Sequence, residues 1–510
     1  MSIIISPDLE YESLKSEHSN VKWTKVQCQN NADFVAGTAT SIGSGLYELV
    51  IPSSVFNLAK SRLSFKVRSA TTTGVPVCAV SPSQYISRVS LSTLSGTLLA
   101  DISSFNKYAH MILPMSTKKS DLDTYANGIP SFSSTDGTLL SLSSAPITSA
   151  QADLFPYGAL CRSDKPFVAA VAANTAIAQF TNMIGDTARH PTQHMGIQTW
   201  AYQTAVGEVD LTFTFSLEEM FKHTALALDK LLYFGESLSL QIYFAPPNDS
   251  LFACLPVAAT TAGAQGYISA DLTKAGLIDN TATVYTFNTI TAPVLLLYQE
   301  MNLDIARKVI EKSRSEGFLI PFSYIYTNRN VIGNASTSHT IQNTINSSLG
   351  SSVLFIASAP YQTNDTKNAF NSNQINTVVR GATSGAVAPV TSTAIALNSY
   401  NTFIDSIPIS NPAGFDVTKS EHYYANQASF EHSCSPLSIT EYNCNWTHVD
   451  NFTGNSLSSL DQTIRNGVSL GATRTYSLQA IWGTACVKNW YTFTSVQRVL
   501  SIKDGVTRVM

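Results

Sequence analysis

Apolar and polar residues alternate with a period of two in segments spread along the whole chain. Apolar side chains fall at Leu63, Phe65 and Val67, and again at every second position of residues 209–215, 238–244, 318–326 and 476–482. Such alternation gives a strand one face for a core and one face for solvent, as in antiparallel sheets. We therefore predict an all-β chain, and its 510 residues, 44% of them hydrophobic, suffice for more than one large core.

The charge of the chain restricts its partners. Charged residues form only 13% of the sequence and the formal net charge is −4, whereas a protein that mainly grips phosphates carries a basic excess. Residues 1–20 hold Asp8, Glu10, Glu12 and Glu17 and form no basic arm. We expect no strong direct binding to nucleic acid. We also expect no transmembrane segment and no secretion signal, because the apolar runs are too short. The seven scattered cysteines are expected to be reduced and mostly buried.

Two segments carry helical patterns. The first, residues 216–235, begins with Ser216 and Glu219 in a capping-box arrangement and ends at Gly235. The second, residues 303–316, contains oppositely charged residues at i,i+4 spacing and stops at Gly317. We interpret this second segment as a solvated helix that connects two β-sandwiches.

The organisation that follows has four parts and long Ser/Thr/Asn-rich loops between strands. We expect an N-terminal arm over residues 1–34, a first β-domain over 35–300, a connector helix over 301–317 and a second β-domain over 318–510.

Motifs that carry chemistry are scarce. His190 and His194 have HxxxH spacing, but Pro191 follows the first and no Glu lies between them. A second group of His and Cys residues has side chains of the types that bind zinc, but their spacing fits no standard structural zinc site. The alternative interpretation is that the cysteines are thiols buried in the core among aromatic residues. The members of this group are His432, Cys434, Cys444 and His448. Whether they cluster in space is open from sequence, and we predict no catalytic residue, no cofactor-binding residue and no metal ligand.

Several hydrophobic segments occur in an order that resembles a known family. They are residues 228–244 (LDKLLYFGESLSLQIYF), 294–298 (VLLLY), 303–307 (LDIAR), 317–320 (GFLI) and 498–505 (RVLSIKDG). Together they resemble the end of the first barrel, the connector helix, the opening strand of the second barrel and the terminal strand of double jelly-roll major capsid proteins. Virophages, polinton-like viruses and nucleocytoplasmic large DNA viruses carry proteins of this family.

The resemblance implies two consecutive eight-stranded jelly-roll β-sandwiches joined by a short connector helix, with long inserted loops. It implies a structural subunit, not an enzyme, that forms homotrimers of pseudo-hexagonal outline. Such pseudo-hexameric capsomers tile an icosahedral shell around a double-stranded DNA genome. The implied partners are neighbouring capsomers, penton proteins and minor capsid proteins, and the implied location is the virion after synthesis in the host cytoplasm.

Two other classes of protein share the composition. A two-sandwich carbohydrate-active or carbohydrate-binding protein is also rich in Ser, Thr, Asn and aromatic residues, but such proteins are usually secreted. A trimeric tail or receptor-binding fibre is also β-rich, but short periodic repeats are expected there and none is evident.

Overall fold

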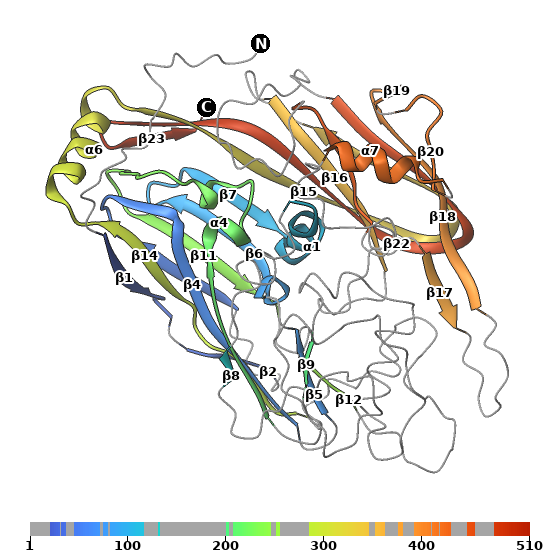
Figure 1. The fold of residues 1–510 in the computed structure, drawn as a ribbon, viewed down its shortest axis with the longest axis horizontal. Helices are drawn as coiled ribbons and strands as arrows, with labels where there is room; N and C mark the ends of the chain where they lie inside the picture. Colours follow the sequence, from blue (N-terminus) through green and yellow to red (C-terminus); the bar gives the residue numbers. More distant parts are fainter. Residues whose placement is uncertain are drawn as a thin grey trace.

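The structure is a computed structural model of the 510-residue chain. It describes residues 21–30, 32–36, 45–71, 75–79, 82–116, 131–132, 200–202, 208–245, 251–254, 285–345, 352–362, 376–380, 392–409, 411–417, 419–429, 446–453 and 474–509. We call the elements before residue 301 the N-terminal half and those after residue 317 the C-terminal half (Figure 1).

Two sheets build the sandwich of the N-terminal half. The seven-stranded sheet runs in the order β1-β14-β4-β10-β8, with β13 on β4 and β2 on β13. Its strands are β1 (Val21–Gln27), β2 (Phe34–Ala36), β4 (Phe56–Thr71), β8 (Ser131–Phe132), β10 (Glu208–Ser216), β13 (Tyr285–Ile290) and β14 (Val294–Glu300). The four-stranded sheet β3-β11-β6-β7 comprises β3 (Leu46–Ile51), β6 (Ile86–Thr93), β7 (Leu98–Ser103) and β11 (Leu238–Phe244).

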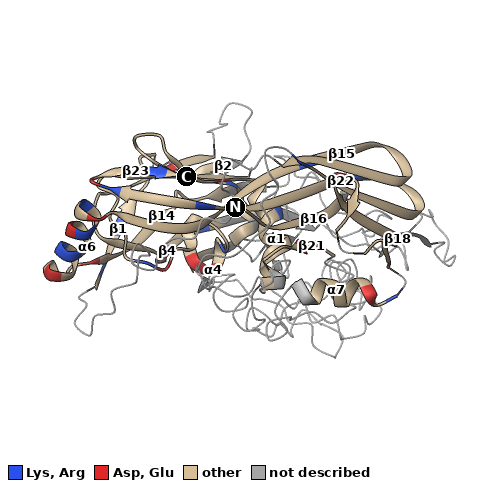
Figure 2. Cartoon of the chain, turned by 90° about the horizontal axis from the view of Figure 1, so that it is seen from above, with Lys and Arg blue, Asp and Glu red and all other residues tan. Residues whose placement is uncertain are grey.

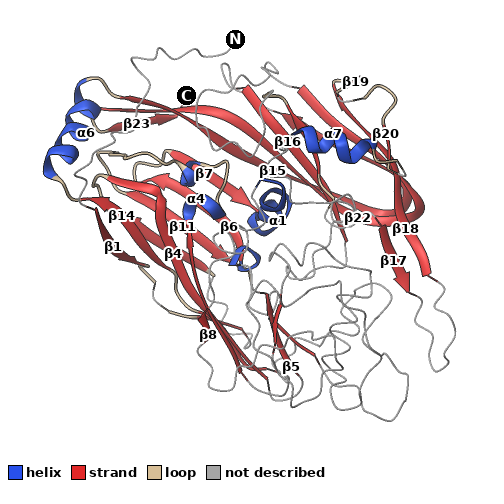
Figure 3. Ribbon diagram, in the orientation of Figure 1, coloured by secondary structure: helices blue, strands red, loops and turns tan. Residues whose placement is uncertain are grey.

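Further short elements lie near this sandwich. A three-stranded sheet, in the order β12-β5-β9, contains β5 (Val75–Ala79), β9 (Trp200–Tyr202) and β12 (Leu251–Cys254). The helical elements are η2 (Pro82–Tyr85), α1 (Phe105–Ser116), α4 (Leu217–Met220) and η7 (Ala225–Ala227). Figure 3 shows how few helices the β-rich molecule contains.

The alternating pattern accounts for the core of this sandwich. Leu63 and Phe65 of β4 pair in antiparallel register with Phe215 and Phe213 of β10, and all four side chains are buried. Phe244 of β11, in the other sheet, contacts the Phe65 ring at a centroid distance of 4.9 Å. The inward side chains of two sheets therefore meet in one aromatic layer.

Helix α6 (Leu303–Ser315) joins the halves, as the sequence predicted for residues 303–316. The Asn302 side chain caps its N-terminus and accepts from the backbone N–H of Asp304 at 3.0 Å. Acidic and basic residues occur close together along this helix (Figure 2). Gly317 follows with φ +83°, which lets the chain turn into the next strand.

The C-terminal half contains one nine-stranded sheet, because two long strands each take part in both layers. These are β15 (Phe318–Ile345) and β22 (Arg474–Lys503), whose pairing shifts register between Ile332 and Ser338. The remaining strands are β16 (Ser352–Gln362), β17 (Asn376–Arg380), β18 (Ser392–Ile404), β19 (Ile407–Pro408), β20 (Phe415–Asp416), β21 (His448–Asn451) and β23 (Val506–Val509), and α7 is Glu421–Ser429.

The two halves follow the same strand order. In the N-terminal half, the pairings β1-β14-β4-β10 and β3-β11-β6-β7 are strands 1-8-3-6 and 2-7-4-5 of a jelly roll. In the C-terminal half, the first layer runs from the start of β15 to the end of β22, then to β16 and then to β21. The second layer runs from the end of β15 to the start of β22, then to β18 and then to β20. The all-β double jelly-roll class is confirmed. The count of eight strands per sandwich stays a prediction.

The helices differ from the sequence prediction in two ways. The helix expected over residues 216–235 is only four residues long, α4, because His223 has φ +59° and the residues around it are buried on every side. Helices α1 and α7 were not expected. Pro114 lies inside α1, and every α1 side chain that the structure describes is buried, the polar Asn106, Lys107 and His110 included, so no exposed polar face marks the helix.

One strand begins earlier than the predicted domain. β1 lies inside residues 1–34, which were predicted to form an arm, and it pairs along its full length with β14. The expected arm therefore overlaps the first sheet. The described cysteines Cys28 and Cys486 are free and buried.

Candidate functional site

The junction between the halves is formed around helix α1, which lies between the strands of both halves (Figure 1). Ser104, with φ +56°, turns the chain from β7 into this helix. The Phe105 ring packs on Phe221 of the N-terminal half at 4.8 Å between centroids. The Tyr108 ring meets Phe493 of β22 edge to face at 5.3 Å. One buried helix therefore contacts both cores.

Hydrogen bonds hold α1 on the N-terminal half. The Tyr108 hydroxyl donates to the backbone carbonyl of Lys222 at 2.8 Å. The Lys222 ammonium donates to the backbone carbonyl of Ser116, the last residue of α1, at 3.2 Å, and lies 3.6 Å from the Glu219 carboxylate. Residues 217–224 therefore bind α1 through the Tyr108 hydroxyl and the Ser116 carbonyl.

A buried polar contact ties α1 to the C-terminal half. His110 Nδ1 lies 2.9 Å from the Tyr361 hydroxyl on β16, and both side chains are buried. Burial, with a smaller contribution from Lys107, lowers the pKa of His110 to about 3. Burial also raises the pKa of Tyr361 well above its usual value. Both groups are therefore neutral at pH 7, and this hydrogen bond links the halves without a buried charge.

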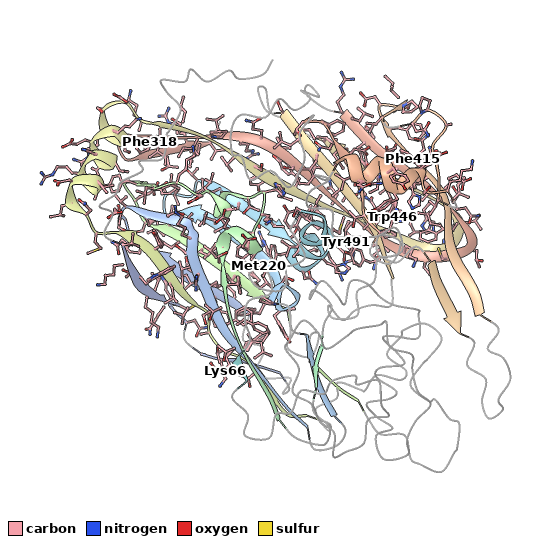
Figure 4. All side chains as sticks on the ribbon, viewed as in Figure 1. Lys66, Met220, Phe318, Phe415, Trp446 and Tyr491 are labelled. Carbon is pink, nitrogen blue, oxygen red and sulfur yellow. The ribbon has the colours of Figure 1, made fainter. Side chains whose placement is uncertain are left out.

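Lys107 brings a cation to the same place. Its ammonium nitrogen lies 4.8 Å from the centroid of the Tyr361 ring and 6.0 Å from that of Tyr491. Figure 4 labels Tyr491 close to α1. The geometry is that of a cation–π contact, which is stronger when it is shielded from water, as here.

A second set of contacts joins the strands of the two halves. Thr327 Oγ1 of β15 donates to the Ser103 carbonyl at 3.1 Å, and Thr97 Oγ1 donates to the Thr507 carbonyl at 3.3 Å. A Cβ atom on Gly235 would lie 2.5 Å from the Cα of Gly505. The halves are therefore in backbone contact at this point, and only glycine fits at residue 235.

Arginine and tyrosine side chains line the same seam. Arg88 binds Asp101 through two hydrogen bonds of 2.7 Å, and its guanidinium lies 5.2 Å from the Tyr243 ring centroid. On the other side, the Arg498 guanidinium lies 4.2 Å from the ring centroid of Tyr324. Burial and then Asp101 raise the pKa of Tyr324, which places the two groups in one electrostatic environment.

A closed polar network lies inside the C-terminal half. His448 Nε2 and Asp450 Oδ1 are 3.1 Å apart, with side-chain exposures of 3% and 2%. The Tyr476 hydroxyl donates to Asp450 Oδ2 at 3.1 Å, and Thr402 Oγ1 donates to Oδ1 at 3.3 Å. Asn426 of α7 accepts from the Val449 backbone N–H at 2.8 Å. The pair is sealed from solvent, and its geometry fixes α7 and three strands to one another.

The residues considered as metal ligands from sequence are mostly beyond the described part of the chain. His190, His194, His432, Cys434 and Cys444 lie outside it, and His448 alone is described, in the network above. Among the described residues, no group of three or more His, Cys, Asp or Glu side chains could hold a metal ion. Over the same residues, no helix has the length and apolarity that crossing a membrane requires.

Sequence reasoning missed the junction entirely. The segment 105–113, FNKYAHMIL, places Asn106, Lys107 and His110 among large apolar residues. Ionisable residues among large apolar ones indicate polar groups that are buried and need partners in the fold. The sequence did not indicate their partners, which lie on β16 and β22.

Comparisons by sequence find no relative. No protein-family model matches the chain, and no curated protein matches it either.

Comparisons by structure find similar chains in virus structures, among them the following three. A chain from the Sputnik virophage structure aligns with a TM-score of 0.50 and 11% identity, over 100% of this chain and 93% of its own. A chain of the PBCV-1 virus capsid aligns with a TM-score of 0.50 and 8% identity, over 98% of both chains. The faustovirus major capsid protein aligns with a TM-score of 0.50 and 9% identity, over 98% of this chain and 93% of its own.

These similarities define the class of fold, an all-β double jelly roll, over nearly the whole length of each chain. At identities of 8% to 11% they establish the fold alone.

Proposed function

We propose that this chain is the major capsid protein of an icosahedral double-stranded DNA virus. The observation that carries the proposal is the repeated strand order, 1-8-3-6 and 2-7-4-5, in two halves whose mutual position is fixed by α1. The similarity to the faustovirus major capsid protein over 98% of this chain supports it. Its role is structural, and no catalytic step is assigned to it.

A fixed pair of like sandwiches suits assembly. Three copies related by a threefold axis present six similar sandwiches, so a trimer acquires a pseudo-hexagonal outline and can tile a shell. The division proposed for this purpose is a segment over 1–34 whose strand β1 belongs to the first sheet, sandwiches over 35–300 and 318–510, and the connector over 301–317. Homotrimers, neighbouring capsomers, penton and minor capsid proteins are the proposed partners, and the virion, after synthesis in the host cytoplasm, is the proposed location.

Light scattering coupled to size exclusion tests the trimer. We expect a particle of about 165 kDa, three times the 55.0 kDa chain. Electron microscopy of the same fraction should show particles of hexagonal outline. A monomer that persists at every concentration and salt condition tested would contradict the proposal.

A further inference from the structure

The outward side of the seven-stranded sheet carries cations beside aromatic rings. We refer to this surface as the outer face. It is formed by Trp23 and Lys25 of β1, Tyr298 of β14, and Lys60, Arg62 and Lys66 of β4. These residues alternate with the buried Leu63, Phe65 and Leu297 that face the core. Figure 4 labels Lys66 toward the lower end of β4.

The rings of this surface are arranged to receive a partner. Trp23 is 44% exposed, and it lies opposite Tyr298 in the β1–β14 register. The two rings meet edge to face at 5.2 Å, and the Arg62 guanidinium lies 5.5 Å from the Trp23 ring. Trp23 therefore presents an exposed aromatic face beside a guanidinium on the edge strand of this sheet.

The residues that define the outer face include four cations, and the carboxylates of Asp229 and Glu218 lie near one of them, Lys60. Lys60 Nζ lies 3.6 Å from Asp229 Oδ1. Neither Lys25 nor Arg62 has a carboxylate partner within the part of the chain that the structure describes. The chain as a whole carries a net charge of −4, so the cations of the outer face are opposite in sign to the net charge of the chain.

We propose that residues 1–20 of the same chain bind across the outer face. This segment carries Asp8, Glu10, Glu12 and Glu17 against Lys15, and Ile3–Ile5 supply apolar side chains for the exposed ring. It directly precedes β1, the edge strand of this very sheet. Twenty residues reach about 60 Å when extended, whereas neighbouring strands are about 4.8 Å apart. The tether also gives the acidic segment an effective concentration of about millimolar at the surface.

Zero-length carbodiimide cross-linking of the full chain tests this proposal. The reagent joins a lysine amine to a carboxylate only where the two are in contact. We expect linked peptides between the carboxylates of residues 1–20 and Lys25, Lys60 or Lys66. They should occur in the monomer band of a denaturing gel, because an intrachain link adds no second chain. The Lys60–Asp229 pair at 3.6 Å provides an internal control for reactivity.

A matched pair of variants tests the role of charge. The double variant Lys25→Gln/Arg62→Gln removes two cations of the outer face, and we expect about a three- to tenfold lower yield of links at Lys60 and Lys66. The control Arg307→Gln/Lys308→Gln removes two exposed cations of α6 and should leave these yields unchanged. Raising the salt to 0.5 M should lower the wild-type yield several-fold.

Three results would overturn the proposal. In the first, residues 1–20 form cross-links to Lys308 and Lys312 of α6 in the same yield as to the lysines of the outer face. The second is an equal loss of yield in both double variants. The third is links found only in the dimer band, which would place the segment on another copy. None of these results depends on whether the chain forms capsomers.

Discussion

At the residue scale, the junction depends on the hydrogen bond between His110 and Tyr361. Tyr361→Phe removes the hydroxyl and keeps the ring that Lys107 contacts. Because His110 then keeps a buried nitrogen without this partner, we expect a loss of about 1–3 kcal/mol in the free energy of unfolding. Chemical denaturation measures it. Tyr424→Phe is the control, since Tyr424 is 62% exposed, and its effect should stay within about 0.5 kcal/mol.

The same histidine makes stability depend on pH. The pKa of His110 is about 3 in the folded chain, against an ordinary value of 6.5. Between these values the unfolded chain binds a proton that the folded chain does not, so stability falls as the pH falls from 6.5 toward 3. One such proton changes the free energy of unfolding by up to about 1.4 kcal/mol per pH unit.

The variant His110→Asn isolates this contribution. Its free energy of unfolding, measured by denaturation from pH 4 to pH 6, should fall less steeply with acid than that of the wild type, by about one proton. Equal slopes in the two proteins would assign the acid sensitivity to other groups.

The residue scale also shows where sequence reasoning ends. The alternation at Leu63 and Phe65 predicted their burial, because a pleated strand allows only two faces. The partner of His110 is 251 positions away, on a strand of the other half. No local pattern encodes such a pairing, since it arises only when two separate cores meet.

At the scale of elements, two glycines offer a matched comparison. Gly235 and Gly505 both have φ +75°, so alanine pays a similar conformational penalty at either position. A Cβ on Gly235 would lie 2.5 Å from the Cα of Gly505, whereas a Cβ on Gly505 would meet nothing within 4 Å. We expect Gly235→Ala to destabilise the chain by about 1–3 kcal/mol more than Gly505→Ala in thermal denaturation. Equal losses would show that the halves separate freely there.

Among the elements, sequence periodicity predicted secondary structure well where one face of the element is exposed to solvent. Helix α6 was predicted from its oppositely charged residues at i,i+4 spacing and from Gly317 at its end, and its buried face carries Ile305 and Val309. Helix α1 was missed because its described side chains are all buried, and the segment after α4 was assigned to a helix because of the capping box at Ser216 and the stop at Gly235. In both cases tertiary burial, and not local propensity, determined the backbone.

At the scale of the whole molecule, the halves have separate sheets and a shared core. Within the described residues, no strand before α6 pairs with a strand after it. The buried apolar cluster nevertheless continues from one sandwich to the other through α1. The sequence predicted two sandwiches with a helix between them. It could not predict the second connection, which converts two tethered sandwiches into one rigid pair.

This shared core predicts that one aromatic side chain couples the halves. Phe493 of β22 is fully buried against Tyr108 of α1, so Phe493→Ala should leave a cavity at the junction and cost about 3–5 kcal/mol. Phe415→Ala is the matched control, because Phe415 is 5% exposed and packs on Tyr400, within the C-terminal half. Hydrogen exchange of the α1 amides distinguishes them. We expect faster exchange in Phe493→Ala and wild-type rates in Phe415→Ala, and if both variants loosen α1 equally, the coupling through Phe493 is refuted.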